Sequence, residues 1–304
     1  MLNSNNAIDT ADEIRSKLWQ VRKDNFKRSW YKFTGNRLSL VGLIIVLIVI
    51  VLAVFAPWVT PYPEHRGAFV DFSNAMQAPN AENWLGTDSV GRDILTRIIF
   101  GFRFSLIMGF VVIGLAAPPG IIAGLVAGYF RDTWVDTLIM RITDVFLAVP
   151  PLILAMAITA VLPPNVFYAM LAVTLMWWPW YARLVYGIAS SLQNEFFVQA
   201  AQITGASRSY IIFREILPNC VSAIFTKMTL DLGIVIIIAS SLSFVGLGAQ
   251  PPTPDLGTMV ADGAKYMPDQ WWMTVCPALA IVFVVLGFNL LGDGLRDMLA
   301  VEEV

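Results

Sequence analysis

The stretch that decides the fold is residues 145–182, VFLAVPPLILAMAITAVLPPNVFYAMLAVTLMWWPWYA, which contains no Asp, Glu, Lys or Arg. A helix needs about 20 mostly apolar residues to cross the hydrocarbon core of a bilayer. This stretch is too long for one crossing and about right for two. Pro163-Pro164-Asn165, near its middle, supplies a turn. The stretch therefore predicts two membrane helices joined by a short connection.

Four more uncharged blocks, each long enough for one crossing, occupy residues 38–63, 104–130, 232–254 and 270–292. Their apolar runs are continuous rather than alternating, which favours helices over the strands of a membrane barrel. The first block is longer than the apolar region of a signal peptide, so we expect a retained helix. The predicted fold class is all-α, a polytopic membrane protein with six transmembrane helices.

Composition agrees with a membrane location. Hydrophobic residues make up 57% of the 304 residues and charged residues 14%, against about 25% charged residues in an ordinary soluble domain. A soluble globular fold and an intrinsically disordered chain are excluded by these fractions. Two cysteines also exclude a disulfide scaffold.

The positions of the positive charges predict the orientation. Eight of the 20 Lys and Arg residues precede the first block, and with six crossings fifteen lie on that side. By the positive-inside rule, both termini are expected in the cytoplasm. The expected division is a basic tail (1–37), a first helix (38–60), an extracytoplasmic loop (61–100), a helical core (101–297) with a cytoplasmic loop (190–218), and a short cytoplasmic tail (298–304).

Apolar residues of the N-terminal tail recur at roughly helical spacing among basic residues: Ile14, Leu18, Phe26, Trp30 and Phe33. This pattern predicts an amphipathic helix lying on the inner membrane surface. The alternative is a solvated, partly ordered tail.

Several chemistries are missing from the chain. No Gly-Lys pair occurs, so no phosphate-binding P-loop can form. The single histidine, His65, excludes a zinc HExxH site, and we expect it to be a solvated loop residue without a role. Cys220 and Cys276 are too few for a four-cysteine metal site and are expected to be small buried residues. Neither a catalytic nor a metal site is predicted.

Acidic residues are absent from the central parts of the six expected helices. Asp144 and Asp231 are expected near inner helix ends, where Lys227 and Asp231, four residues apart, are expected to form a satisfied pair on one helix face. The absence of deep acids counts against an ion-coupled carrier and against an intramembrane aspartyl protease.

Small residues and prolines predict how the helices pack. Gly120, Gly124 and Gly128 form a stripe that allows another helix backbone to approach closely. Pro118-Pro119, Pro150-Pro151 and Pro179 are expected to bend or break their helices. Kinked helices with freed carbonyls are expected to line a central cavity, although ordinary packing kinks would give the same pattern.

The expected cytoplasmic loop contains two short helices around Gly205. The first helix is expected to end there with a left-handed cap, and Ser207 is expected to cap the second. Ala200 and Ala201 leave room for another protein to pack closely. The alternative is a loop helix that packs only on its own membrane domain.

At this loop the chain resembles the EAA loop of ABC importer permeases, in QAAQITG at 199–205 followed by ILP at 216–218. LGTDSVGRDILTR at 85–97 is similar to the LGTDxxGRDxxSR segment of the C-type permeases of dipeptide, oligopeptide and nickel importers. GYF at 128–130, MRITD at 140–144, LSFVGLGAQPPTP at 242–254 and FNLLGDGLRD at 288–297 also resemble that family. The resemblance covers residues 30–297.

The resemblance implies a type I ABC importer permease fold in a bacterial or archaeal cytoplasmic membrane. The implied partners are a second homologous permease, two ATPase subunits at the cytoplasmic loop, an extracytoplasmic substrate-binding protein and the lipid bilayer, with no nucleic acid. ATP and Mg are expected on the ATPases, and no cofactor on this chain. Peptides are the implied substrate, with nickel, glutathione and oligosaccharides as alternatives.

The resemblance also implies residue roles. It assigns contact with the ATPase to Glu195, Gln199, Ala200, Ala201, Gly205, Ala206, Ser207, Leu217 and Pro218. It assigns the extracytoplasmic family segment to Gly86, Thr87, Asp88, Gly91, Arg92 and Asp93. Gln199 stands where the family has a glutamate, and Glu195, one helical turn earlier, is a possible substitute.

Overall fold

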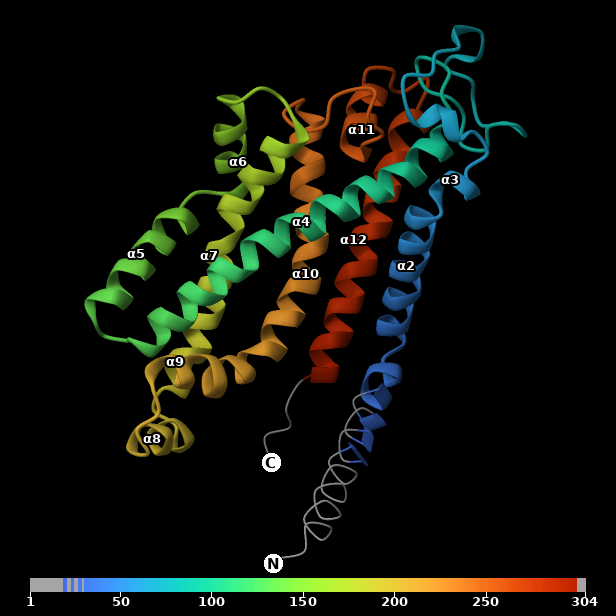
Figure 1. Ribbon diagram of the computed structural model, residues 1–304. Coiled ribbons are helices and arrows are strands. Elements are labelled where there is room, and N and C mark those ends of the chain that lie inside the picture. Colours follow the sequence, from blue (N-terminus) through green and yellow to red (C-terminus); the bar gives the residue numbers. More distant parts are fainter. Residues whose placement is uncertain (1–18, 21–22, 25–26, 29, 300–304) are drawn as a thin grey trace, which may run out of the picture.

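The computed structural model describes residues 19–20, 23–24, 27–28 and 30–299, and these are mostly helical (Figure 1). The α-helices are α2 (Arg37–Val54), α3 (Ala56–Val59), α4 (Ile94–Tyr129), α5 (Trp134–Leu147), α6 (Pro151–Ala160), α7 (Val166–Leu192), α8 (Phe196–Ile203), α9 (Arg208–Tyr210), α10 (Leu217–Phe244), α11 (Leu256–Ala264) and α12 (Trp272–Leu299). Two 3-10 turns, η1 (Pro63–Arg66) and η2 (Phe72–Asn74), and a π-helical turn, η3 (Ile211–Ile216), complete the described elements.

Four stretches of the described chain are long and apolar enough to cross a membrane: α2, α4, the run Arg208–Phe244 that contains α10, and α12. The pair α5 and α6, bent by 84° at Pro150, raises the number to five. Helix α7 has 27 residues, but its middle is rich in Trp and contains Arg183, which lowers its hydropathy. The structure therefore supports four to five apolar spans, against the six that the sequence predicts.

Two helices begin well before the uncharged blocks. Helix α4 starts at Ile94, where the Asp93 carboxylate accepts a hydrogen bond of 2.7 Å from the N–H of Thr96. Helix α10 starts at Leu217, so Asp231 lies halfway along it, with 1% of its surface exposed. The prediction that Asp231 lies near a helix end is wrong, because the preceding loop continues as helix without a break.

The three proline positions that are expected to bend or break their helices differ in whether they break them. Pro118 and Pro119 lie inside the continuous helix α4, and Pro179 inside the continuous helix α7. Of these three positions, Pro150-Pro151 is the one that separates two helices, α5 and α6. A proline removes one backbone donor, and the dense contacts that follow Pro119 hold α4 together.

Those contacts come from the glycine stripe, which packs against α7. A Cβ added at Gly124 would lie 2.5 Å from the carbonyl oxygen of Ala182, and one at Gly128 would lie 2.6 Å from Cβ of Ala189. At Gly120 the added atom would overlap the carbonyl oxygen of Trp178. The backbones of α4 and α7 therefore approach closely, which is possible because glycine has no side chain.

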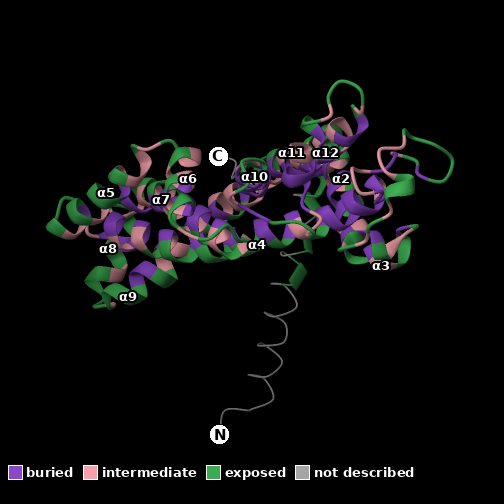
Figure 2. Ribbon diagram, turned by 90° about the horizontal axis from the view of Figure 1, so that it is seen from above, coloured by how far each residue is buried: buried purple, intermediate pink, exposed green. Residues whose placement is uncertain are grey.

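Helix α4 runs obliquely across α7, α10, α12 and α2 (Figure 1). Buried residues gather where α4 crosses these helices, whereas the outer faces of α5 and α8 are exposed (Figure 2). Helix α12 packs against α2 through Gly287, which contacts Ile45. The end of the bundle that carries α8 and α9 is named the α8 end, and the opposite end is named the α11 end.

The predicted amphipathic tail is only partly visible. Ile14, Leu18 and Phe26 lie outside the described residues. Trp30 and Phe33 are helical and stack with ring centroids 5.5 Å apart, and Phe33 is buried.

Candidate functional site

The loop at the α8 end, residues 190–218, is built around a helix cap at Gly205. This residue has a φ of +81°, a conformation that glycine adopts without strain. Its N–H donates to the carbonyl of Gln202 at 3.0 Å, and the N–H of Ala206 donates to the carbonyl of Ala201 at 3.0 Å. These two bonds form a Schellman motif, which ends α8 and reverses the chain.

The chain beyond the cap is capped again and then helical. Ser207 Oγ accepts a hydrogen bond of 3.3 Å from the N–H of Tyr210, as the sequence predicts. The second helix is not separate, however: α9, η3 and α10 follow one another without a break. Leu217 is half-buried and Pro218 is exposed, and the π-helical turn η3 directly precedes this proline, which has no N–H to donate. The Arg208 guanidinium lies 5.5 Å from the ring centre of Phe130, at the end of α4.

The residues of α8 that the resemblance assigns to contact with the ATPase lie on different faces of the helix. Val198 is buried, and Ala201 and Ala206 pack with it against the chain's own apolar cluster at the ends of α4 and α7. Ala200 faces outward. The structure thus turns Ala200 and Ala201 to different sides, which the sequence alone does not show.

Two large apolar side chains stand free on α8, and sequence reasoning missed them. Phe196 is 87% exposed and Ile203 is 86% exposed. They are seven residues apart, about two helical turns, so both lie on one face. The sequence does contain a signal for this pair: two bulky apolar residues stand among polar residues that favour contact with water. Exposed apolar patches on folded proteins mark contacts with another protein or with a membrane.

Gln199 and Glu195 have different roles in the geometry of α8. Glu195 occupies the N-cap position without a capping hydrogen bond from its side chain, and it is exposed. Gln199 Nε2 donates to the carbonyl of Asn194 at 2.9 Å. A glutamate at 199 has no donor for that carbonyl, so the amide ties the helix to the preceding turn in a way that the family's residue does not.

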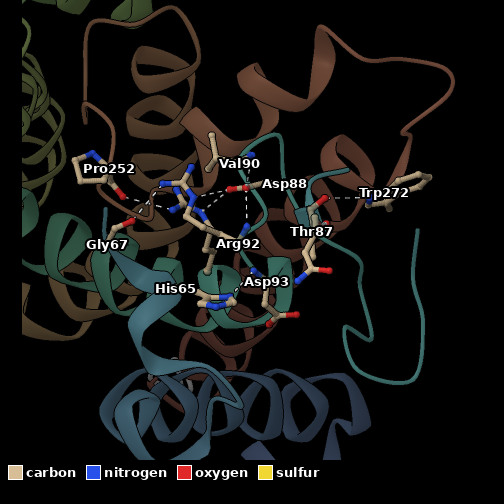
Figure 3. Close-up of polar contacts among 11 residues, drawn as sticks. His65, Gly67, Thr87, Asp88, Val90, Arg92, Asp93, Pro252 and Trp272 are labelled. Atoms are coloured by element: carbon tan, nitrogen blue, oxygen red, sulfur yellow. Dashed lines mark hydrogen bonds and ion pairs between the residues drawn. The ribbon is translucent and has the colours of Figure 1, made fainter. Parts of the chain in front are cut away.

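At the α11 end, residues 85–97 form a hydrogen-bonded cluster around Asp88, named the Asp88 cluster (Figure 3). One carboxylate oxygen of Asp88 accepts hydrogen bonds from the N–H groups of Val90, at 3.0 Å, and Arg92, at 2.9 Å. The other pairs with Nε of Arg92 at 2.7 Å and lies 3.6 Å from Nε of Arg97. Asp88 therefore joins the start of α4 to the turn that precedes it.

The Asp88 cluster also forms hydrogen bonds with segments that are distant in the sequence. Arg92 donates to the carbonyl of Gly67, Arg97 to that of Pro252, and the indole of Trp272 to that of Thr87 at 3.4 Å. Gly86 and Gly91 have φ of +77° and +86°. A Cβ at Gly91 would overlap the carbonyl oxygen of Asp71. The residues of the family segment thus make contacts within the chain, and most of them are buried.

His65 is buried beside the Asp88 cluster, so the expectation of a solvated loop histidine is wrong. The residue is 9% exposed, and its ring stacks between those of Phe69 and Tyr62, with centroids 4.0 Å and 4.9 Å away. Its Nδ1 accepts a hydrogen bond of 3.0 Å from the N–H of Asp93. Burial lowers the pKa of His65 below its usual value, although Glu64 and Asp93 oppose the shift.

The apolar spans, the capped loop at one end and the buried cluster at the other define a class of protein: a helical membrane protein. The chain belongs to the family of binding-protein-dependent transport system inner membrane components, whose model matches residues 120–301. A second model, the N-terminal transmembrane domain of oligopeptide transport permease C, matches residues 25–79. The chain is therefore an ABC importer permease, as the resemblance implies.

Characterised relatives match almost the whole chain. The dipeptide transport system permease protein DppC of Alkalihalophilus pseudofirmus is 42% identical over 274 residues, which cover 90% of this chain and 89% of the relative. The glutathione transport system permease protein GsiD of Escherichia coli is 42% identical over 283 residues, 92% of each chain.

A solved structure shares the fold. The inward-facing MetNI methionine ABC transporter matches with a TM-score of 0.55 and 18% sequence identity, over 68% of this chain and 98% of that chain. At this identity the likeness concerns the fold alone, and it supports the type I ABC importer permease architecture.

Proposed function

We propose that this chain is the permease subunit of an ATP-driven importer of di- or oligopeptides and forms half of the translocation pathway. The observation that carries the substrate class is the 42% identity to a dipeptide permease over 90% of the chain. The bundle crosses the membrane six times, with α7 and the bent pair α5–α6 completing the set, and both termini are cytoplasmic. The α8 end is then cytoplasmic, and the α11 end is extracytoplasmic.

Energy enters through α8. The chain has no P-loop, so two ATPase subunits bind ATP and Mg and contact this helix. Phe196 and Ile203 fill an apolar recess on the ATPase, and Ala200 lets the two surfaces come close. The Schellman cap and the unbroken helix from Arg208 onward pass the ATPase movement to the bundle. Coupling requires only that the ATPase bind one state of the bundle better than the other.

A substrate-binding protein contacts the α11 end. The family segment itself is internal, so the contact falls to exposed side chains around it, such as Phe72, at 74% exposure, and Trp84, at 69%. A second, homologous permease completes the pathway. Most of this chain's own substrate contacts lie along their shared surface.

Glutathione is the second candidate substrate, because the glutathione permease is as similar to this chain as the dipeptide permease. Proteoliposomes that contain the complete importer distinguish the two. We expect ATP-dependent uptake of radiolabelled dialanine, and uptake of labelled glutathione without that of dialanine would replace peptide with glutathione.

The assembly itself is tested by purification in mild detergent and mass spectrometry of the bound chains. Two ATPases and a second permease should copurify with the wild type. The double variant Phe196→Ser/Ile203→Ser should lose the ATPases but keep the second permease, and Gln202→Ala, exposed on the same helix, should keep all partners. Retention of the ATPases by the double variant would show that the apolar pair is not the contact.

A further inference from the structure

Helices α5 and α7, which pack side by side, share an exposed surface that is polar (Figure 1). From Tyr181 to Leu192, the exposed residues of α7 recur at every fourth position and so lie on one face. Helix α5 adds polar residues on the adjacent side. This surface, named the polar flank, consists of Thr137, Arg141 and Asp144 of α5 and Arg183, Gly187 and Ser191 of α7.

The centre of the polar flank is an ion pair inside the membrane. The Arg183 guanidinium pairs with the Asp144 carboxylate, and 48% and 42% of the two side chains are exposed. Helix α7 has 27 residues, about 40 Å, and Arg183 lies about 14 Å from its end at Leu192. The hydrocarbon core is about 30 Å thick. In the proposed topology, Arg183 therefore lies inside this core rather than at its edge.

The exposed side of α2 has the opposite character. Beyond Arg37, every exposed residue of α2 is apolar, including Val41, Ile44, Leu47, Ile48 and Val51. Such a side suits the acyl chains of a bilayer, whereas charged groups at membrane depth face a bundle interior or a water-filled cavity. The half-exposed pair of the polar flank therefore faces water rather than lipid.

The polar flank also carries a charge without a partner. Arg141 is exposed and forms no ion pair with any residue that the structure describes. Nothing lies within 4 Å of a Cβ added at Gly187, so the space in front of α7 is open. Because Arg183 and Asp144 compensate each other, the flank presents one net positive charge beside an open space.

We propose that the polar flank is this chain's wall of the translocation pathway in the half nearest the α8 end, and that Arg141 attracts the carboxylate of the passing peptide. Water in the pathway solvates the exposed sides of Asp144 and Arg183. A guanidinium without a partner is the complement of the C-terminal carboxylate that every free peptide carries. The inference rests on the proposed function, which it deepens by naming residues that line the pathway.

Thiol labelling tests whether the flank faces water. In a Cys220→Ala/Cys276→Ala background, Arg141→Cys places a thiol on the polar flank, and Ile142→Cys places one on the neighbouring apolar side of α5. The complete importer, in proteoliposomes without nucleotide, is treated with a charged, water-soluble methanethiosulfonate. Since the thiolate reacts and apolar surroundings suppress its formation, we expect labelling to be about tenfold faster at 141 than at 142. Equal rates at the two positions would overturn the wall.

Trapping of the ATPases separates the pathway from a permanent crevice. ATP with vanadate holds the ATPase dimer closed, and the half of the pathway nearest α8 is then closed as well. Labelling of Arg141→Cys should slow several-fold. Gly35→Cys, exposed with open space around it before α2, should label at an unchanged rate. An unchanged rate at 141 would show that the polar flank lies outside the pathway.

A charge series at position 141 tests the contact with the peptide. We expect the maximal rate of dialanine uptake to fall several-fold in Arg141→Gln, to fall further in Arg141→Glu and to be largely restored in Arg141→Lys, which keeps the charge. Equal rates for the Gln and Lys variants would overturn the role of the charge. Absence of dialanine uptake by the wild-type importer would instead contradict the peptide function, and the labelling results would still decide the wall.

Discussion

The Nδ1 atom of His65 accepts a hydrogen bond of 3.0 Å from the backbone N–H of Asp93, the residue that caps α4. This bond requires an Nδ1 without a proton, so the ring is neutral with its proton on Nε2. It joins a 3-10 turn of the first long loop to the start of the second apolar helix. The protonation state of one ring therefore bears on how a long helix begins.

This geometry predicts a pH dependence of stability. The pKa of His65 is lowered in the fold from 6.5, so the unfolded chain binds the proton more tightly. The contribution of His65 is present above pH 6.5 and is lost as the pH falls through the folded pKa. We expect the detergent-solubilised protein to lose more thermal stability between pH 7.5 and 5.5 than the variant His65→Asn, which keeps an acceptor but does not titrate. Parallel pH profiles would show that His65 remains neutral or does not contribute.

Gly91 should tolerate no side chain. Its positive φ alone makes Gly91→Ala cost about 1–2 kcal/mol, and overlap with the carbonyl of Asp71 adds to this. We expect faster proteolysis in residues 61–93 and a lower melting temperature. Gly67→Ala is the matched control, because open space surrounds that position in the same loop. Equal effects of the two substitutions would contradict the tight turn.

The stripe of α4 predicts a contrast within one helix. Gly124→Ala sets a methyl group against backbone atoms of α7, which cannot retreat, and overpacking of this kind costs about 1–3 kcal/mol. Gly114→Ala, on the same helix with nothing within 4 Å, should be neutral or slightly stabilising. Thermal unfolding in detergent measures both. If Gly124→Ala is as stable as Gly114→Ala, the close approach of α4 and α7 is not required.

Gly205 should be sensitive to backbone conformation and not to size, because its φ is +81° and nothing lies within 4 Å of an added Cβ. Gly205→Asn should couple nearly as well as wild type, since asparagine adopts positive φ more readily than other residues. Gly205→Pro fixes φ near −65° and removes the bond to Gln202, so peptide imported per ATP hydrolysed should fall. Equal coupling ratios would show that the cap is dispensable.

Of the adjacent residues Ala200 and Ala201, Ala200 is the one at which a large side chain tests the contact with the ATPase. A tryptophan at Ala201 would disrupt the seat of α8 on the chain's own cluster, so a loss of coupling there would not report on the ATPase. Ala200→Trp, on the exposed face, is the informative change. It should weaken ATPase binding in pull-down assays, whereas the bundle melts at the wild-type temperature.

Local signals in the sequence predicted local structure well. The turn at Pro163-Pro164-Asn165 separates α6 from α7, and the side chain of Asn165 caps α7 at 2.8 Å. The cap at Gly205 and the pair Lys227–Asp231 are also confirmed. In each case the deciding atoms lie within five residues of one another, so spacing is sufficient.

Features that depend on contacts between distant parts of the chain are not predicted by the sequence. His65 is buried by Phe69 and by the turn before α4, which no local pattern shows. The start of the uncharged block predicts that Asp231 lies at a helix end, yet a paired acid is tolerated halfway along α10. Pro118 and Pro119 fail to break α4, because the glycine stripe that follows docks the helix on α7.

The unbroken helix from Arg208 to Phe244, 37 residues long, has a consequence for how such chains vary in length. A single residue inserted between Arg208 and Asp231 as regular α-helix would rotate α8 by about 100° relative to the charged pair and shift it about 1.5 Å along the axis. The apolar pair on α8 would then point away from its contact even though every contact within α10 survived. We therefore expect homologous chains to differ in length in the loops at the α11 end and to keep one constant spacing across this segment, because the angle between α8 and α10 depends on that spacing.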